Sequence, residues 1–410
     1  MTGALANVRV LELTAAMAGP WIGRYMAACG AEVIRVESRK HPDVVRLYVP
    51  PRAPETGVQP RSSPWFTDWN AGKLFVALDL TRPRGVELFL RLVARADAVV
   101  SNYSAGVMGR LGLGYESLRR VNETIIVFAT SGYGESGPCS SYVTWGPNIE
   151  ALSGLGTLSG FPRRECTITQ YAYPDVLTAL HGLFAVMCAL DHRRRTGQGQ
   201  HIDLAQLETT VAAVGDVMME QLANGVEPPR LGNRSRHFAP HGCYRCQGDD
   251  RWCVIAVRDE AEWARFCDVV GEPAWRDDPR FSDRAHRLAH VEELDALIER
   301  WTAARSDYAV MALLQDAGIA AGVVQHVGDL ARADRQIAAR RFFEEVEHLQ
   351  KGKVVATGVP LGLTATPVHT GRSGAAVGED NEHVFGTLLG MTADEIRACI
   401  EDGAIETPEG

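Results

Sequence analysis

The chain has 410 residues, 46% of them hydrophobic, with a mean hydropathy of −0.10, so it can bury a large core and is long enough for two domains. Its formal net charge of −9 argues against general nucleic-acid binding, while leaving room for a local basic pocket that takes a phosphorylated ligand. No basic leader opens the sequence, and no window approaches the roughly 20 apolar residues of a membrane span. These features predict a cytoplasmic protein.

Strand and helix patterns alternate through the first 134 residues. VRVLEL is a β-rich run, GPWIGRYMAACG predicts a helix after Gly19-Pro20, and AEVIRVE predicts a second strand. Further strands are expected at 74–80, 97–103 and 124–134, and further helices at 84–96 and 115–122. This alternation predicts an α/β fold with a doubly wound, Rossmann-like parallel sheet that binds ligands at the carboxyl ends of its strands. Because no GxGxxG follows the first strand, a dinucleotide site has little support.

The composition changes after about residue 225, where a stretch rich in Pro, Gly and Arg lacks any period and predicts a linker. Beyond it, two short strands about a turn and two helices, 260–271 and 291–304, predict a smaller α+β domain. Exposed strands within 342–367 and a helix at 392–403 close the chain. The expected organisation is a large domain over 1–205, a linker over 206–235, a small domain over 236–325, a linker over 326–350, and a return to the large domain over 351–410.

Nine cysteines are spread along the chain without the framework of a small disulfide-rich scaffold. Cys243 and Cys246 have metal-like spacing, but Cys253 and His241 would have to complete a zinc site. A strand pair with two small buried residues on a β-hairpin is the favoured interpretation. No metal is expected.

Asp175 opens the apolar run YPDVLTALHGLFAVMCAL, which has the character of a helix. Taken alone, an aspartate at this place is a helix cap that suits the positive end of the helix dipole. A carboxylate there can also be a nucleophile. The residue itself does not decide between the two roles.

Several ordered segments together resemble the family III CoA-transferases, typified by formyl-CoA transferase and carnitine CoA-transferase, with α-methylacyl-CoA racemase as a relative. The resemblance covers nearly the whole chain. Its strongest segments are VRVLELTAAMAGPWIGRYMAACGAEVIRVE, NAGKLFVALDL, DAVVSNYSAGVMGRLGLGYESLRRVN, SGYGESGP, ALSGL, PDVLTALHG, RRRTGQGQHIDLAQLE, DDPRF and the late GED.

The resemblance implies that Asp175 matches the family's nucleophilic aspartate. Exchange of CoA between two acids without hydrolysis needs a carboxylate that forms anhydrides and a thioester in turn. It also implies chemistry with no metal and no organic cofactor beyond the substrate CoA, and succinyl-CoA is a common donor in the family. The helix N-terminus is expected to lower the pKa of Asp175 and keep it ionised.

An oxyanion site and an acyl pocket should adjoin this aspartate. The formyl-CoA enzyme carries a His and a Gln in the loop after the first strand, where this chain has Ala15 and Met17. Backbone N–H groups near Ala16 and Met17 are left as the expected oxyanion donors. The apolar loop together with Trp145 indicates an acyl group bulkier than formate or oxalate. The glycine-rich flap of the formyl-CoA enzyme has no clear match here, so none is assigned.

Lys and Arg side chains should bind the phosphates of CoA. By resemblance, the expected contacts are Arg39, Lys73 and Arg110. Asn102 and Gly106 match a loop whose backbone passes close to the pantetheine arm.

Two alternatives stay open from the sequence. Asp175 matches the aspartate of the racemase equally well, but that enzyme also has a His-Asp pair where this chain has Trp145 and Gly146, so two-base proton abstraction is disfavoured. The other alternative is a non-catalytic partner subunit of a heteromeric CoA-transferase. The resemblance further implies a homodimer of interlocked protomers.

Overall fold

The computed structural model describes residues 3–48, 63–169, 171–348 and 352–407, and the chain divides into two compact units. Unit 1 comprises residues 1–156, 168–225 and 336–410, and unit 2 comprises residues 157–167 and 226–335. The first and last described residues of the chain therefore belong to unit 1.

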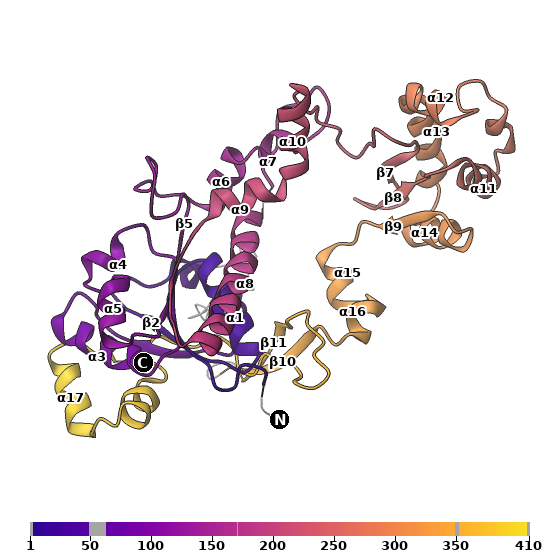
Figure 1. Ribbon diagram of the computed structural model, residues 1–410. Coiled ribbons are helices and arrows are strands. Elements are labelled where there is room, and N and C mark those ends of the chain that lie inside the picture. Colours follow the sequence, from indigo (N-terminus) through magenta and orange to yellow (C-terminus); the bar gives the residue numbers. More distant parts are fainter. Residues whose placement is uncertain (1–2, 49–62, 170, 349–351, 408–410) are drawn as a thin grey trace. The chain divides into compact units, whose positions relative to one another are not determined.

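Unit 1 is built on a six-stranded parallel sheet of order β3-β2-β1-β4-β5-β6. Figure 1 labels β2 and β5 of this sheet. Its strands are β1 (Arg9–Leu13), β2 (Glu32–Glu37), β3 (Leu74–Ala77), β4 (Ala98–Ser101), β5 (Ile126–Ser131) and β6 (His201–Ala205). β1 pairs in register with both β2 and β4, and the chain runs outward from it in both directions. The predicted doubly wound sheet is confirmed, and its switch point lies between β1 and β4.

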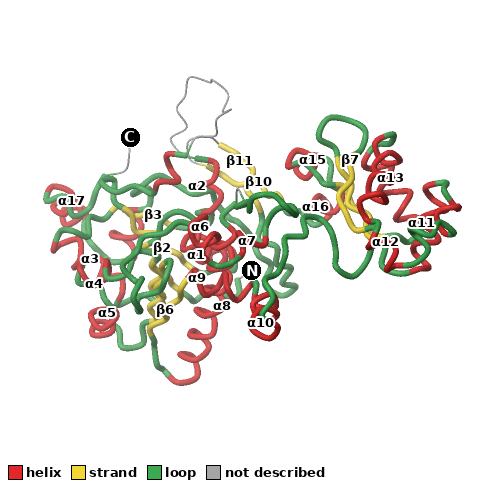
Figure 2. The backbone as a smooth tube through the Cα atoms, turned by 90° about the horizontal axis from the view of Figure 1, so that it is seen from above, coloured by secondary structure: helices red, strands yellow, loops and turns green. Residues whose placement is uncertain are grey.

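Alternate residues of each strand face opposite layers of helices, as a period of two requires. On β1, Leu11 and Leu13 enter one apolar core, and Val10 enters the other. The first core lies under α3 (Pro83–Val93) and α5 (Tyr115–Val121), and the second lies under α1 (Ala18–Ala28) and α8 (Tyr173–Thr196). Figure 2 shows the strands between these two sets of helices.

Helix α8 packs tightly on α1 and on β5, because Gly182 leaves no side chain between them. A Cβ at this position would lie 2.7 Å from Ile22 Cδ1 and 2.7 Å from Phe128 Cζ. A side chain at residue 182 would therefore push α8 off the sheet. This close contact fixes the distance between α8 and the sheet. It thereby also fixes the position of Asp175 in the first turn of α8.

By length and composition α8 is apolar enough to cross a membrane, so the expectation that no window approaches this limit is wrong. One such helix is weak evidence for a membrane span, because the core helix of a globular protein passes the same test. Part of α8 is buried in unit 1, where Ala179, Val186 and Ala189 belong to the core below α1.

The end of the chain returns to unit 1 and binds the edge strand β3. The antiparallel hairpin of β10 (Phe343–His348) and β11 (Gly352–Thr357) begins the return. The Phe75 N–H then donates to Asp380 at 2.7 Å, and the Ala77 N–H donates to Asn381 at 2.9 Å. A π-helix, η3 (Glu382–Leu388), and helix α17 (Ala393–Glu401) follow. The predicted late strands and final helix are confirmed.

Unit 2 contains a three-stranded antiparallel sheet, β7 (His241–Arg245), β8 (Trp252–Ala256) and β9 (Ala320–Val323). The helices around it are α11 (Glu260–Val270), α12 (Arg284–Ala289), α13 (Val291–Ala303), α14 (Asp307–Asp316) and the 3-10 helix η2 (Pro273–Arg276). Cys243 lies on β7, and Cys246 is buried directly after it. Over the described ranges, no group of three or more His, Cys, Asp and Glu could hold a metal ion.

Both stretches predicted as linkers contain regular structure. The first, 206–235, holds α9 (Gln206–Ala213) and α10 (Gly215–Asn224), and the chain becomes irregular only at Gly225, where the Pro- and Gly-rich segment starts. The second, 326–350, holds α15 (Val327–Arg332), α16 (Arg335–Ala339) and β10; residues 349–351 lie outside the described part. Shorter elements not expected from the sequence are η1 (Val44–Leu47), α2 (Pro64–Trp69), α4 (Val107–Arg110), α6 (Gly146–Leu152) and α7 (Leu155–Leu158).

Candidate active site

A cavity of ≈160 Å³ lies at the carboxyl edge of the parallel sheet, where open α/β sheets bind their ligands. Four strands send residues into it: β1 and β4 through the loops that follow them, β5 through its last residues, and β6 through the first residue after it. The lining residues are Ala15, Ala16, Asn102, Ser104, Thr130, Ser131, Gly132, Tyr142, Val143, Thr144, Trp145, Asp175 and Gln206. Four predicted site residues, Ala16, Asn102, Trp145 and Asp175, thus meet in one place.

Asp175 is held in this cavity by the start of α8. Pro174 in the first turn favours a helix start here, because proline is preorganised for the first turn and its missing N–H would be unpaired there. The backbone N–H groups of Asp175 and of Ala18, the first residue of α1, favour the charged form of the Asp175 carboxylate, while the Asp175 N–H itself donates to Ala172 O at 3.0 Å. The amino ends of two helices therefore converge on one carboxylate.

Burial raises the pKa of Asp175 to about 6, although the Gln206 side chain and the backbone N–H groups of Ala18 and Asp175 act in the opposite direction. The expected lowering of this pKa by the helix end is therefore wrong, since the loss of water around the carboxylate outweighs the donors. A carboxylate of this pKa is ionised at neutral pH and more basic than an ordinary aspartate.

Gln206 is a site residue that the sequence reasoning missed. Its Nε2 donates to Asp175 Oδ1 at 3.4 Å, and its side chain is buried at the first position of α9. Thr178 of α8 and Thr209 of α9 share a hydrogen bond of 3.1 Å, which holds the two helix starts together. Gln206 directly follows β6, so an expected strand at 201–205 would have placed it at the carboxyl edge.

We expect Gln206→Leu to raise the pKa of Asp175 further, because the leucine keeps the bulk and removes a donor that favours the charged form. The acid limb of the pH profile for acyl-CoA turnover should move to higher pH. Gln315→Leu is a matched control, since Gln315 donates to Ala321 O at 2.8 Å within unit 2. An unshifted limb in Gln206→Leu would show that this amide does not act on the carboxylate.

Gly146 gives the Asp175 carboxylate its space. A Cβ at residue 146 would lie 2.3 Å from Asp175 Oδ2, a distance that no real contact allows. Gly146 opens α6, and Trp145 before it is exposed and lines the same cavity. The pair Trp145-Gly146 therefore adjoins the carboxylate.

Gly146→Ala should displace the carboxylate and lower turnover by about 100-fold, the scale on which a misplacement of about 1 Å acts. Gly215→Ala is the matched control: at the start of α10, an added Cβ meets no described atom within 4 Å. Steady-state rates of both variants test this. Equal rates for Gly146→Ala and wild type would mean that the Asp175 carboxylate does not need its observed position.

The loop after β1 differs from expectation in two respects. The N–H of Ala16 donates to Asp43 Oδ1 at 3.1 Å, so it is not available as an oxyanion donor. Met17 is buried and is not among the residues that line the cavity. The apolar wall consists of Ala15 and Ala16, and the backbone N–H that reaches the carboxylate belongs to Ala18.

Lys73 is an interior residue, which corrects its predicted contact with CoA. Its Nζ donates to Glu12 Oε1 at 2.8 Å, to Pro20 O at 2.8 Å and to Asn70 Oδ1 at 2.9 Å, and the residue is fully buried. Burial lowers its pKa to about 7, against the raising effect of Glu12. All three donors of an ammonium group are used, so none is left for a phosphate.

A second cavity of ≈460 Å³ shares Asn102 and Ser104 with the first. It is lined by Val36, Glu37, Ser38, His41, Leu78, Asp79, Leu80, Thr81, Asn102, Tyr103, Ser104, Val107 and Leu111. Arg39 and Arg110 are exposed and lie next in sequence to its lining residues Ser38 and Leu111.

Gly106 and Asn102, which are also predicted to lie close to CoA, are found near these two cavities. Gly106 precedes α4 with φ +79, a left-handed conformation that favours glycine. The side chain of Asn102 binds the Ala15 peptide rather than pointing freely into a cavity. The contacts of Arg39, Asn102, Gly106 and Arg110 with CoA stay predictions.

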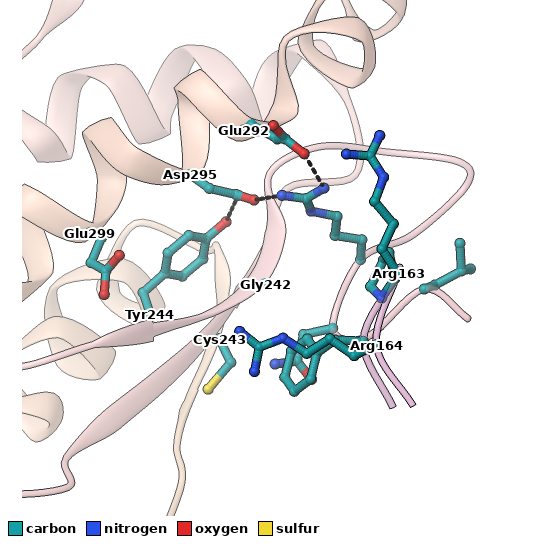
Figure 3. Close-up of a pocket in the computed structure, with 13 residues that line it drawn as sticks. Arg163, Arg164, Gly242, Cys243, Tyr244, Glu292, Asp295 and Glu299 are labelled. Atoms are coloured by element: carbon teal, nitrogen blue, oxygen red, sulfur yellow. Dashed lines mark hydrogen bonds and ion pairs between the residues drawn. The ribbon is translucent and has the colours of Figure 1, made fainter. Parts of the chain in front are cut away.

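Unit 2 has its own cavity of ≈530 Å³, drawn in Figure 3, and no predicted site residue lines it. The Tyr244 hydroxyl donates to Asp295 at 2.8 Å, and Arg234 pairs with Asp295 at 3.2 Å and with Glu292 at 3.5 Å. Three arginines face three carboxylates in its lining, so the charges balance. Burial raises the pKa of Asp295 here as well, but Tyr244 and Arg234 both bind that carboxylate.

The fold and the first cavity define an α/β enzyme that presents one basic carboxylate at the switch point of a doubly wound sheet. A family model described as CoA-transferase family III matches residues 5–381. The chain belongs to CoA-transferase family III and is a CoA-transferase by class. The family expected from the sequence segments is confirmed.

Individual relatives agree with this class. The chain is 31% identical to a succinyl-CoA–D-citramalate CoA-transferase of Chloroflexus aurantiacus, covering 96% of each protein. It is 32% identical over 98% of its length to the Probable CoA-transferase Rv1866 of Mycobacterium tuberculosis, of which it spans 50%. A solved CAIB/BAIF family protein from Brucella suis superposes with a TM-score of 0.87 at 30% identity, over 95% of this chain and 100% of that one.

Proposed function

We propose that this chain moves CoA from an acyl-CoA donor to a carboxylic acid, with Asp175 as the nucleophile. The observation that carries the proposal is the partly buried Asp175 carboxylate in a cavity at the carboxyl edge of the sheet. It is held by the starts of α1 and α8 and is more basic than an ordinary aspartate. Greater basicity favours attack on a thioester.

In each step of the transfer one bond forms and one leaving group departs, and no step uses water. An Asp175 oxygen attacks the donor acyl carbon and expels CoA thiolate, which gives a mixed anhydride. The thiolate attacks the aspartyl carbonyl and expels the donor acid, which leaves an aspartyl-CoA thioester. The acceptor carboxylate attacks this carbonyl and expels thiolate again. The thiolate then takes the acceptor acyl group from the second anhydride, and the carboxylate of Asp175 is restored.

The two neighbouring cavities support a path for CoA. In this proposal the nucleotide end occupies the larger cavity, with Arg39 and Arg110 near its rim, and the pantetheine arm passes Asn102 and Ser104. The thioester then reaches the smaller cavity beside Asp175. Glu37 and Asp79 in the larger cavity disfavour a bare phosphate deep inside it, so the phosphates belong at the rim.

The acyl group is proposed to be larger than a formyl group. The smaller cavity has a volume of ≈160 Å³. Ala15, Ala16 and Trp145 give it apolar walls. Succinyl-CoA is the proposed donor, since the Chloroflexus aurantiacus relative is named for it.

Racemisation of α-methylacyl-CoA is the less favoured reaction. It needs a second base on the far side of the substrate carbon. The described residues that line the Asp175 cavity include no histidine and no other carboxylate. The presence of Asp175 in the cavity likewise disfavours a non-catalytic partner subunit.

We also propose a cytoplasmic homodimer that needs no cofactor beyond its substrate CoA. Exposed apolar side chains on α8 and α10 support a homodimer: Phe184 is 70% exposed and Leu222 is 73% exposed. Such residues on helices are typical of an interface with a second copy. Light scattering of wild type and Phe184→Glu tests this, and a monomeric wild type would contradict it.

The transfer reaction is tested by incubating the protein with succinyl-CoA and a panel of carboxylic acids, with chromatography of the acyl-CoA products. A new acyl-CoA and free succinate in equal amounts are expected. A second reaction contains a 2-methylacyl-CoA in heavy water. Deuterium at its α-carbon, with no new acyl-CoA in the first reaction, would overturn the proposal in favour of the racemase.

A further inference from the structure

The loop between β1 and α1 is held in a strained conformation beside the candidate nucleophile. Ala16 has φ +58, a left-handed conformation that an alanine side chain rarely adopts. Backbone strain of this kind persists only where the surroundings determine it, and it is concentrated at functional sites. Contacts from other parts of the chain must therefore hold Ala16 in this left-handed conformation.

Side chains from other parts of the chain bind successive peptide groups of this loop. Asn102 Oδ1 accepts the Ala15 N–H at 2.8 Å, and Asn102 Nδ2 donates to Ala15 O at 2.7 Å. Asp43 Oδ1 accepts the Ala16 N–H at 3.1 Å. Every polar backbone atom between the Ala15 N–H and the Ala16 N–H is thus paired with a side chain.

The same side chains are themselves fixed by burial. Arg35 Nη2 donates to Asp43 Oδ2 at 2.6 Å and to Thr14 O at 3.0 Å, and both Arg35 and Asp43 are buried. Asn102 lies against the first turn of α1, where a Cβ at Gly19 would be 2.9 Å from Asn102 Cγ. These contacts form a clamp, defined here as Asn102, Asp43 and Arg35.

The loop that the clamp holds adjoins the Asp175 carboxylate, where the reaction is proposed to occur. Two residues beyond Ala16, the backbone N–H of Ala18 favours the charged form of the Asp175 carboxylate. Ala15 and Ala16 also line the cavity of that carboxylate. Any relaxation of Ala16 toward an ordinary backbone conformation would rotate the start of α1 and move both the donor and the wall.

We propose that Asn102 and Asp43 are positioning residues, which hold the loop in its left-handed form so that the Ala18 N–H reaches Asp175. This inference rests on the proposed function for its effect on catalysis, and on the loop geometry alone for its structural part. This role of the Asn102 side chain adds to the predicted passage of pantetheine along the backbone of the same loop. The side chain acts on the nucleophile through the backbone of residues 15–18 and not through CoA.

The first test compares Asn102→Ala with Asn122→Ala. Asn122 Nδ2 also donates to two backbone carbonyls, Val93 O at 3.1 Å and Ala96 O at 2.9 Å, but at the opposite edge of the sheet. Hydrogen exchange by mass spectrometry should show faster exchange of the peptide over residues 14–20 in Asn102→Ala only. This readout needs no substrate.

The second readout is the rate of covalent CoA adduct formation against pH. We expect Asn102→Ala to lower this rate by about tenfold to 100-fold, since a displacement of about 1 Å at a reacting group costs on the order of 100-fold. The acid limb should move to higher pH, because the Asp175 carboxylate loses a donor that favours its charged form. A substitution that only weakens the fold, such as Asn122→Ala, would leave the acid limb of the pH profile unshifted.

A suppressor distinguishes strain from simple misfolding. Glycine adopts a positive φ at no steric cost, so Ala16→Gly in the Asn102→Ala background should recover part of the lost rate. No recovery in the double variant, together with wild-type exchange of residues 14–20 in Asn102→Ala, would overturn the clamp.

The outcomes separate the clamp from the proposed function. If wild type forms no adduct with any donor, the proposed function fails, and hydrogen exchange still decides the clamp. If wild type forms the adduct and Asn102→Ala forms it at the same rate with the same pH profile, the clamp is wrong and the function stands.

Discussion

Asp175→Asn should lose CoA exchange by at least about 10⁴-fold, on the scale seen when a nucleophile is removed. The amide keeps the size of the side chain but cannot form an anhydride with an acyl group. Isotope exchange between an acyl-CoA and its free acid gives the rate. Asp191→Asn is the matched control, since Asp191 is at the other end of α8 and pairs at the surface with Arg194 and Arg195. A loss in both variants, or in neither, would contradict the assignment.

The same variant should be more stable than wild type at pH 8. The pKa of Asp175 is raised to about 6 in the folded protein, above the ordinary value of 3.8. Between those values the folded state binds more protons than the unfolded state, so stability falls as pH rises through this window. A shift of about 2 units costs about 3 kcal/mol once the carboxyl is ionised. The stabilisation by Asp175→Asn should fade as pH falls toward 4, which thermal unfolding at pH 4 and pH 8 would show.

Arg35→Met is expected to have the largest effect on stability, a loss of about 3–5 kcal/mol in the free energy of unfolding of unit 1. The Arg35 side chain is fully buried and pairs with Asp43 at 2.6 Å and with Glu37 and Glu12 at 3.5 Å. Removing it leaves three buried carboxylates with one fewer cation. Urea titration measures the change.

A surface pair gives the control for this loss. Arg84 pairs with Glu87 at 2.7 Å on α3, and both side chains are largely exposed. Arg84→Met should therefore change stability by no more than about 0.5 kcal/mol. A loss of less than about 1 kcal/mol in Arg35→Met would show that the remaining cations, Lys73 and Arg46, compensate for it.

The sequence predicted the sheet well because its strands carry a strong local signal. Val10, Leu11 and Leu13 lie in a β-rich run, and each following helix has caps or Pro and Gly at its ends. The edge strand β6 was missed because His201 and Asp203 face outward and give HIDLA little apolar character. Missing that strand hid Gln206, which is the first residue after it.

Long-range contacts explain the other errors at the site. Lys73 resembles a phosphate ligand in sequence, but its partner Glu12 is 61 residues away, on strand β1. The N–H of Ala16 was expected to be free because nothing local binds it, and it is bound by Asp43. The pKa of Asp175 was expected to fall because helix ends are visible in a sequence, whereas burial depends on how α6, α8 and α9 pack.

The most direct test of Asp175 as the CoA acceptor is mass spectrometry of the intact protein after brief incubation with succinyl-CoA, followed by peptide mapping. The account predicts a CoA-sized mass increase in wild type, located on the peptide that contains Asp175, and no increase in Asp175→Asn. An adduct of the same mass on another residue, or one that persists in Asp175→Asn, would contradict it.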